Sequence, residues 1–124
     1  MIVKKHNFLG SVKFALAGIK TATKYNRNMR IHFIIAIFVV IFTFIFGLNN
    51  LEKAIIAMII LLVISAEMIN TAIEEVVDLI TKEYREEAKY AKDVSAGMVL
   101  IASTASAIVG VLIFLPHVLR FFGI

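Results

Sequence analysis

Residues 31–48 read IHFIIAIFVVIFTFIFGL, a stretch of eighteen residues in which His32 and Thr43 are the polar interruptions. As an α-helix, a segment of this length rises about 27 Å, close to the hydrocarbon thickness of a bilayer. The stretch therefore predicts a membrane-spanning helix. It also sets the fold class of the whole chain, because a soluble domain of this size has too little interior to bury such a run.

Two further apolar segments follow towards the C-terminus. After a short turn at residues 47–50, an apolar run covers 54–66. The helical pattern then continues through Asp78 without a Gly or Pro break. A polar, mixed-charge segment at 81–93 precedes a third apolar run over 94–118. The pattern predicts an all-α integral membrane protein with three transmembrane helices. The helices that contain the spans are expected over residues 30–48, 52–81 and 91–120.

Residues 1–28 have a different pattern, because their apolar residues are spaced rather than continuous. At about 100° per residue, one stripe of a helix collects six of them. These are Phe8, Leu9, Val12, Ala15, Leu16 and Ile19, and three lysines (Lys13, Lys20 and Lys24) flank the stripe. The pattern favours an amphipathic helix lying in the membrane interface. A helix packed on a protein core would have the same periodicity.

The composition agrees with a membrane protein. Of 124 residues, 60% are hydrophobic, and the mean hydropathy is +0.92. There is no cysteine and there are three histidines, which excludes disulfide frameworks and Cys/His zinc sites. The net charge is +4, but the basic residues crowd residues 4–30 while every acidic residue lies from Glu52 onward. This distribution indicates a membrane surface rather than nucleic acid.

The positions of Lys and Arg also predict the orientation. Seven lie before residue 31 and four lie in the segment between spans two and three. By the positive-inside rule, the N-terminus and that second loop are cytoplasmic. We therefore expect a multi-pass protein of the cell (inner, cytoplasmic) membrane.

The second span carries a polar face. Glu67, Asn70, Thr71, Glu74 and Asp78 project from an arc of about 100° when the segment is helical. Each ionised carboxylate in hydrocarbon costs on the order of 3 kcal/mol, so such a face indicates a functional site turned towards protein, water or metal. For Asp78, a solvated helix end is an equal alternative. That alternative is weaker for Glu67 and Asn70, which lie deeper in the span.

Clustered carboxylates without His or Cys suit a hard cation such as Mg²⁺, whose usual companion is a phosphate. Lys92 and Asp93 precede the third span and could return to the same end of the bundle. These features suggest phosphoryl transfer to a molecule embedded in lipid. No Walker or kinase glycine motif occurs. An ion-conducting or proton-carrying membrane oligomer would explain the acidic face equally well.

Residues 67–78, EMINTAIEEVVD, and the Ala-Lys-Asp at 91–93 resemble the signature elements of the prokaryotic diacylglycerol kinase family. Residues 27–32, RNMRIH, are similar to a run of the Gram-positive undecaprenol kinase branch. The resemblance covers essentially the whole chain. It implies one membrane-embedded lipid kinase domain over residues 1–124, a homotrimer with sites between subunits, and ATP and Mg²⁺ as co-substrate and cofactor. The acceptor would be a membrane lipid, with undecaprenol favoured and diacylglycerol possible.

The resemblance also implies roles for individual residues. Glu67 would be the base that activates the lipid hydroxyl, Asn70 would position the reacting groups, and Glu74 would bind the magnesium. The positions that match nucleotide-site positions of the family are Glu83, Tyr84, Lys92 and Asp93. Asn26 stands where the family normally has a second metal-binding glutamate, and its amide oxygen could still coordinate magnesium without contributing charge.

Overall fold

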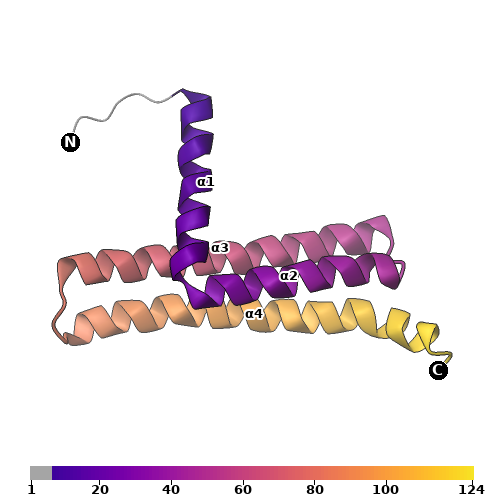
Figure 1. Ribbon diagram of the computed structural model, residues 1–124. Helices are drawn as coiled ribbons and strands as arrows, with labels where there is room; N and C mark the ends of the chain where they lie inside the picture. The colour runs from indigo at the N-terminus through magenta and orange to yellow at the C-terminus, as the bar shows by residue number, and fades with distance from the viewer. Residues whose placement is uncertain (1–6) are drawn as a thin grey trace.

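The computed structural model describes residues 7–124, which form four α-helices and no strand. The helices are α1 (Phe8–Tyr25), α2 (Arg27–Ile45), α3 (Asn50–Ile80) and α4 (Glu86–Phe121). Figure 1 shows α2, α3 and α4 side by side, with α1 crosswise to them. The first part of the expected 1–28 helix, with Lys4 and Lys5, lies outside the described residues.

The three helices that lie side by side confirm the prediction of three spans. α2, α3 and α4 have 19, 31 and 36 residues, and each is long and apolar enough to cross a bilayer. α4 begins at Glu86, earlier than the expected residue 91. It also continues through Pro116 to Phe121, although we expected the third span to end near this proline. A proline is tolerated inside a transmembrane helix where neighbouring groups satisfy the freed carbonyl.

The first two helices meet at Asn26. α1 ends at Tyr25 rather than at the expected residue 28, because Asn26 adopts an extended backbone with φ −100° and ψ 117°. Its side-chain oxygen accepts hydrogen bonds from the backbone N–H groups of Asn28 and Met29, at 2.8 and 3.3 Å. Asn26 is therefore the N-cap of α2, a position that asparagine favours. The cap fixes the corner between the crosswise helix and the first span.

The apolar stripe of α1 is exposed in the single chain. Ala22 is the buried residue of this helix. The side chains of the apolar stripe are open instead, with Phe8 81%, Leu9 75% and Leu16 61% exposed. The stripe is therefore not packed on the core of this chain. The placement of α1 in the membrane interface stays a prediction, and the crosswise position of the helix and its exposed stripe suit it.

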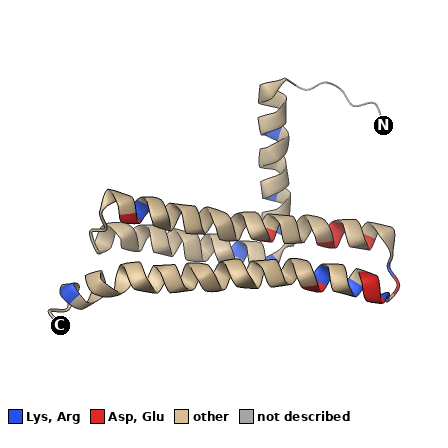
Figure 2. Cartoon of the chain, turned by 180° about the vertical axis from the view of Figure 1, so that it is seen from behind, with Lys and Arg blue, Asp and Glu red and all other residues tan. Residues whose placement is uncertain are grey.

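The bundle is held mainly by the pairing of α3 with α4. Val63, Ala66 and Ala102 form its buried centre, with Met98 and Val99 packed against them. Figure 2 shows charged residues at both ends of the bundle and also between them, near the corner where α1 meets the bundle. On α4, residues 94–119 contain no Lys, Arg, Asp or Glu. This stretch is long enough to cross the apolar centre of a bilayer.

At the end of the bundle remote from α1, a polar pair joins α3 to α4. His117 Nε2 lies 3.0 Å from both carboxylate oxygens of Glu52. Glu52 also completes a capping box with Asn49, which starts α3 after the turn at Gly47, where φ is +65°. The pairing of His117 was not predicted from the sequence.

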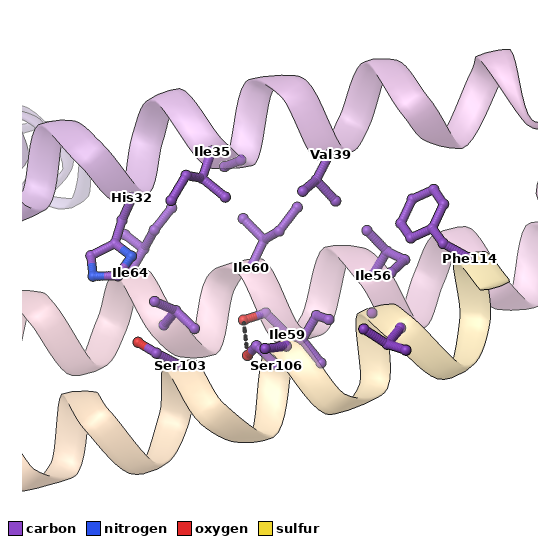
Figure 3. A pocket seen from close by; sticks show the side chains of 15 residues that line it. His32, Ile35, Val39, Ile56, Ile59, Ile60, Ile64, Ser103, Ser106 and Phe114 are labelled. Carbon is purple, nitrogen blue, oxygen red and sulfur yellow. Dashed lines mark hydrogen bonds between the residues drawn. The ribbon is translucent and has the colours of Figure 1, made fainter. Parts of the chain in front are cut away.

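An apolar groove of about 510 Å³ runs along the bundle between α2, α3 and α4. Figure 3 shows His32, Ile64 and Ser103 at one end of this groove, and Ile56 and Phe114 at the other. The end at Ile64 lies about one helical turn from Glu67, since three residues separate them on α3. The groove thus ends close to the polar face, although no residue of that face lines it.

Candidate active site

The polar face of α3 is turned into the protein. Glu67 is 1% exposed and Asn70 is 4% exposed, whereas Glu74 and Asp78 are partly exposed. Burial therefore decreases along the face towards the C-terminal end of α3. A buried carboxylate is stable only where polar groups contact it, so the partners of Glu67 define the site.

Asn26 supplies one of these partners from the corner between α1 and α2. Its amide Nδ2 donates to Glu67 Oε1 at 2.9 Å and to Thr71 Oγ1 at 2.7 Å. The Thr71 hydroxyl donates in turn to the Glu67 backbone carbonyl at 2.9 Å. Because Asn26 Oδ1 caps α2, both ends of this amide are engaged. The side chain connects the start of the first span with the deepest acid of the second.

A second group of hydrogen bonds connects α3 to α4. Asn70 Nδ2 donates to Glu74 Oε1 at 3.1 Å. Its Oδ1 accepts a hydrogen bond from Ser95 Oγ at 2.7 Å, and Ser95 is 3% exposed. Asn70 therefore lies between a hydroxyl on α4 and the carboxylate of Glu74. Hydrogen bonds to a carboxylate stabilise its ionised form and fix its orientation.

An ion pair closes the outer part of the same face. Lys92 Nζ on α4 donates to Asp78 Oδ1 on α3 at 2.6 Å. Lys89 forms a second ion pair with Asp93, one turn apart on the exposed side of α4. The Asp78–Lys92 pair places a cation beside the acidic end of α3. A lysine there can contact an anionic phosphate.

The loop at residues 81–85 carries the other expected nucleotide contacts. Glu83 and Tyr84 are exposed, and the Tyr84 side chain is 78% exposed. Within residues 7–124, no hydrogen bond or ion pair joins either side chain to the buried cluster. In a single chain, the structure therefore brings together Asn26, Glu67, Asn70 and Glu74 but leaves Glu83 and Tyr84 facing outward.

Comparison with known proteins identifies the family to which these residues belong. The sequence pattern described as prokaryotic diacylglycerol kinase matches residues 13–114, which cover α2 and α3, most of α1 and most of α4. The chain belongs to the prokaryotic diacylglycerol kinase family. This membership, with the names of its relatives, places it among membrane lipid kinases.

Three relatives illustrate the range of this kinase family. An undecaprenol kinase of Bacillus subtilis is 40% identical over 111 residues, covering 90% of this chain and 90% of the relative. A diacylglycerol kinase of Synechocystis is 40% identical over 114 residues, and the match spans 91% of this chain and 65% of that longer protein. A diacylglycerol kinase of Haemophilus influenzae is 34% identical over 110 residues, covering 87% of this chain and 93% of the relative.

Kinases of this family use ATP as phosphate donor, and phosphoryl transfer from ATP commonly needs a divalent cation. The side chains of the cluster can therefore be compared with the ligands that Mg²⁺ prefers. Within residues 7–124, no three His, Cys, Asp or Glu side chains gather into a complete metal cage. Mg²⁺ does not need one, because it usually binds one or two carboxylates and takes its other oxygens from water and phosphates. Glu74 is partly exposed, so its carboxylate could be one such ligand.

Sequence reasoning missed two parts of this candidate site. Ser95 was not singled out, although it is a polar residue at the start of an apolar run and follows Lys92 by one helical turn. The contact between Asn26 and Glu67 was also missed, since 41 residues separate them. A signal for the corner was present, because asparagine before a helix-forming run is a common N-cap. The metal role of Asn26 stays a prediction.

Proposed function

We propose that this chain transfers the γ-phosphoryl group of ATP, with Mg²⁺, to the hydroxyl of a membrane lipid. Undecaprenol is the favoured acceptor, and diacylglycerol is possible. The observation that carries the proposal is the carboxylate of Glu67, which is 1% exposed within an apolar span and lies one turn from the apolar groove. A lipid in that groove would present its hydroxyl to a base already held in place by Asn26.

In this mechanism each side chain has a separate role. A primary alcohol has a high pKa, so Glu67 takes the hydroxyl proton as the new P–O bond forms. The bond between the γ-phosphorus and the β,γ-bridging oxygen breaks in the same step, and ADP leaves. When bound, Mg²⁺ neutralises charge on the phosphates. Glu74 would hold that ion, and Asn70 orients the reacting groups beside it. Lys92 and Asp93 on α4, and Glu83 and Tyr84 in the preceding loop, are proposed to bind the nucleotide.

The proposed lipid acceptor rests on two observations. The Bacillus subtilis relative, which this chain matches over 90% of both lengths, is named an undecaprenol kinase. The groove is almost entirely apolar and needs an occupant with a long hydrocarbon chain, which either acceptor supplies. The first support favours undecaprenol, and the second supports a lipid in general.

We further propose a homotrimer with sites between subunits, in the cytoplasmic membrane, with the N-terminus and the mouth of the site cytoplasmic. The orientation follows from the basic residues of α1 and of residues 82–92. Glu83 and Tyr84 face outward in one chain, so a neighbouring subunit would complete a nucleotide site around them. One chain buries Glu67 and Asn70 but leaves Glu74 and Asp78 partly exposed, so a neighbouring subunit would cover the outer part of the polar face.

A direct assay tests the reaction. Purified protein in mixed micelles with Mg²⁺, γ-labelled ATP and an acceptor panel is expected to label undecaprenol faster than diacylglycerol. Omitting Mg²⁺ should abolish the labelling. The competing function is a non-enzymatic ion-conducting or proton-carrying oligomer. If no lipid is labelled while reconstituted vesicles conduct cations, the kinase proposal is wrong for this chain.

The metal role of Asn26 gives a separate prediction. Asn26→Asp keeps an oxygen to cap α2 but replaces the amide donor by a second oxygen facing Glu67. The added negative charge should strengthen cation binding, so the Mg²⁺ concentration for half-maximal activity should fall about three- to tenfold. Titration of activity with Mg²⁺ measures this. Asn28→Asp, an exposed position in the same turn, is the control for added charge. Wild-type Mg²⁺ dependence in Asn26→Asp would show that residue 26 does not face the metal.

A further inference from the structure

A buried serine on α4 contacts the proposed metal-binding part of the cluster. Ser95 Oγ lies 2.7 Å from Asn70 Oδ1 and 2.9 Å from the backbone carbonyl oxygen of Lys92. Asn70 Nδ2 lies 3.1 Å from Glu74 Oε1. Three side chains from two helices thus form a hydrogen-bonded series that ends on the Glu74 carboxylate.

The direction of this series depends on the serine. An asparagine amide has an acceptor on one side and donors on the other, so its orientation decides what a neighbour meets. With Oδ1 towards Ser95, the NH₂ group of Asn70 faces Glu74. The flipped amide would place its oxygen beside the carboxylate, and two acceptors repel. The Ser95 hydroxyl donates to Oδ1 in the observed orientation and holds the amide from the side opposite Glu74.

The second acceptor near Ser95 does not weaken this argument. The Lys92 carbonyl lies within α4, where the backbone N–H four residues later is its regular partner. Asn70 Oδ1 is buried, and Ser95 is the partner that the structure gives it. Loss of the hydroxyl would leave that buried oxygen without a donor, so the amide would be held from the Glu74 side alone and would be free to move away from the carboxylate.

We propose that Ser95 is a positioning residue, which fixes the Asn70 amide and through it holds the Glu74 carboxylate ready for the cation. The proposal rests on the proposed function in one respect, the assignment of Glu74 as the metal ligand. Side chains that orient a metal ligand typically contribute 10- to 100-fold to metal affinity. Ser95 would exert this effect without contacting substrate.

The test is Ser95→Ala in the full chain in detergent micelles, with Mn²⁺ binding followed by electron paramagnetic resonance. The dissociation constant for Mn²⁺ is expected to rise about tenfold. In the lipid phosphorylation assay, the Mg²⁺ concentration for half-maximal rate should rise in parallel, while kcat at saturating Mg²⁺ changes less. Ser95→Thr keeps the hydroxyl and should restore Mn²⁺ affinity close to the wild-type value.

Ser106→Ala is the matched control. Ser106 Oγ also donates from α4 to α3, to the Ile59 carbonyl at 3.3 Å, but this bond lies in the apolar groove, where Figure 3 marks it with a dashed line. Its loss should leave Mn²⁺ binding unchanged. If Ser106→Ala weakens Mn²⁺ binding as much as Ser95→Ala, Ser95 merely packs the helices and the proposal is overturned.

Unchanged Mn²⁺ affinity in Ser95→Ala would overturn the positioning role, and a wild-type protein that still phosphorylates lipid would leave the proposed function intact. A wild-type protein that phosphorylates no lipid contradicts the proposed function instead. In that case the Mn²⁺ binding of the variants decides the role of Ser95 by itself, since it needs no catalytic turnover.

Discussion

Glu67→Gln is expected to lower kcat for lipid phosphorylation about 10³-fold, with nucleotide binding little changed. Glutamine keeps the volume of the side chain, and its amide oxygen can accept the 2.9 Å hydrogen bond from Asn26. What it removes is the ability to take the lipid hydroxyl proton, and general-base help is worth roughly 10²- to 10⁴-fold. Steady-state kinetics in mixed micelles, with a separate ATP-binding measurement, separate the two effects.

Glu75→Gln is the matched control for this variant. Glu75 lies on the same helix and is exposed, so its substitution removes one negative charge without touching the buried cluster. We expect nearly wild-type kcat from it. If Glu67→Gln lowers only the yield of folded protein and leaves specific activity intact, the buried carboxylate is structural and its assignment as base is wrong.

Glu74→Gln is expected to have the second-largest effect, of a different kind. Its oxygen can still accept the 3.1 Å hydrogen bond from Asn70, but the negative charge that attracts a cation is gone. The Mg²⁺ concentration for half-maximal activity should rise about 10- to 100-fold, and ATP binding should weaken with it. Mg²⁺ titrations of both activity and ATP binding measure these changes.

The contrast between the two variants tests the division of roles along α3. Glu67→Gln should lose rate at every Mg²⁺ concentration, whereas high Mg²⁺ should recover part of the activity of Glu74→Gln. If excess Mg²⁺ rescues Glu67→Gln and not Glu74→Gln, the two roles are exchanged. Equal and unrescued losses in both variants would contradict a separate metal-binding role for Glu74.

Much of the fold could be predicted from the sequence, because the apolar runs are long and the bilayer fixes the length that a span needs. The polar face of α3 followed from helical periodicity, since Glu67, Asn70 and Glu74 lie within one segment. The ends of the helices were less certain. α1 ends at Tyr25 because the Asn26 side chain caps the next helix, a local competition that hydrophobic periodicity does not detect.

The contacts between helices could not be predicted in the same way. Asn26 meets Glu67 across the α1–α2 corner, and Ser95 meets Asn70 across the α3–α4 pair. His117 meets Glu52, which lies 65 positions earlier in the sequence. Each contact depends on how far a helix is rotated about its own axis relative to the helix it packs against. A single sequence defines the face of each helix, but it does not define which residues of two faces meet.

The depth of Glu67 links this chain to the thickness of its membrane. Between Lys53 and Glu67, α3 has thirteen residues without charge, a rise of about 20 Å, whereas a typical hydrocarbon core is about 30 Å thick. Glu67 also contacts Asn26 at the corner between α1 and the first span, so its carboxylate is at the level of the proposed interfacial helix. A bilayer matched to these two levels would be thinner around the protein than a typical one. Lipids with longer chains would oppose this thinning, so we expect the thickness of the bilayer to influence the rate of phosphorylation.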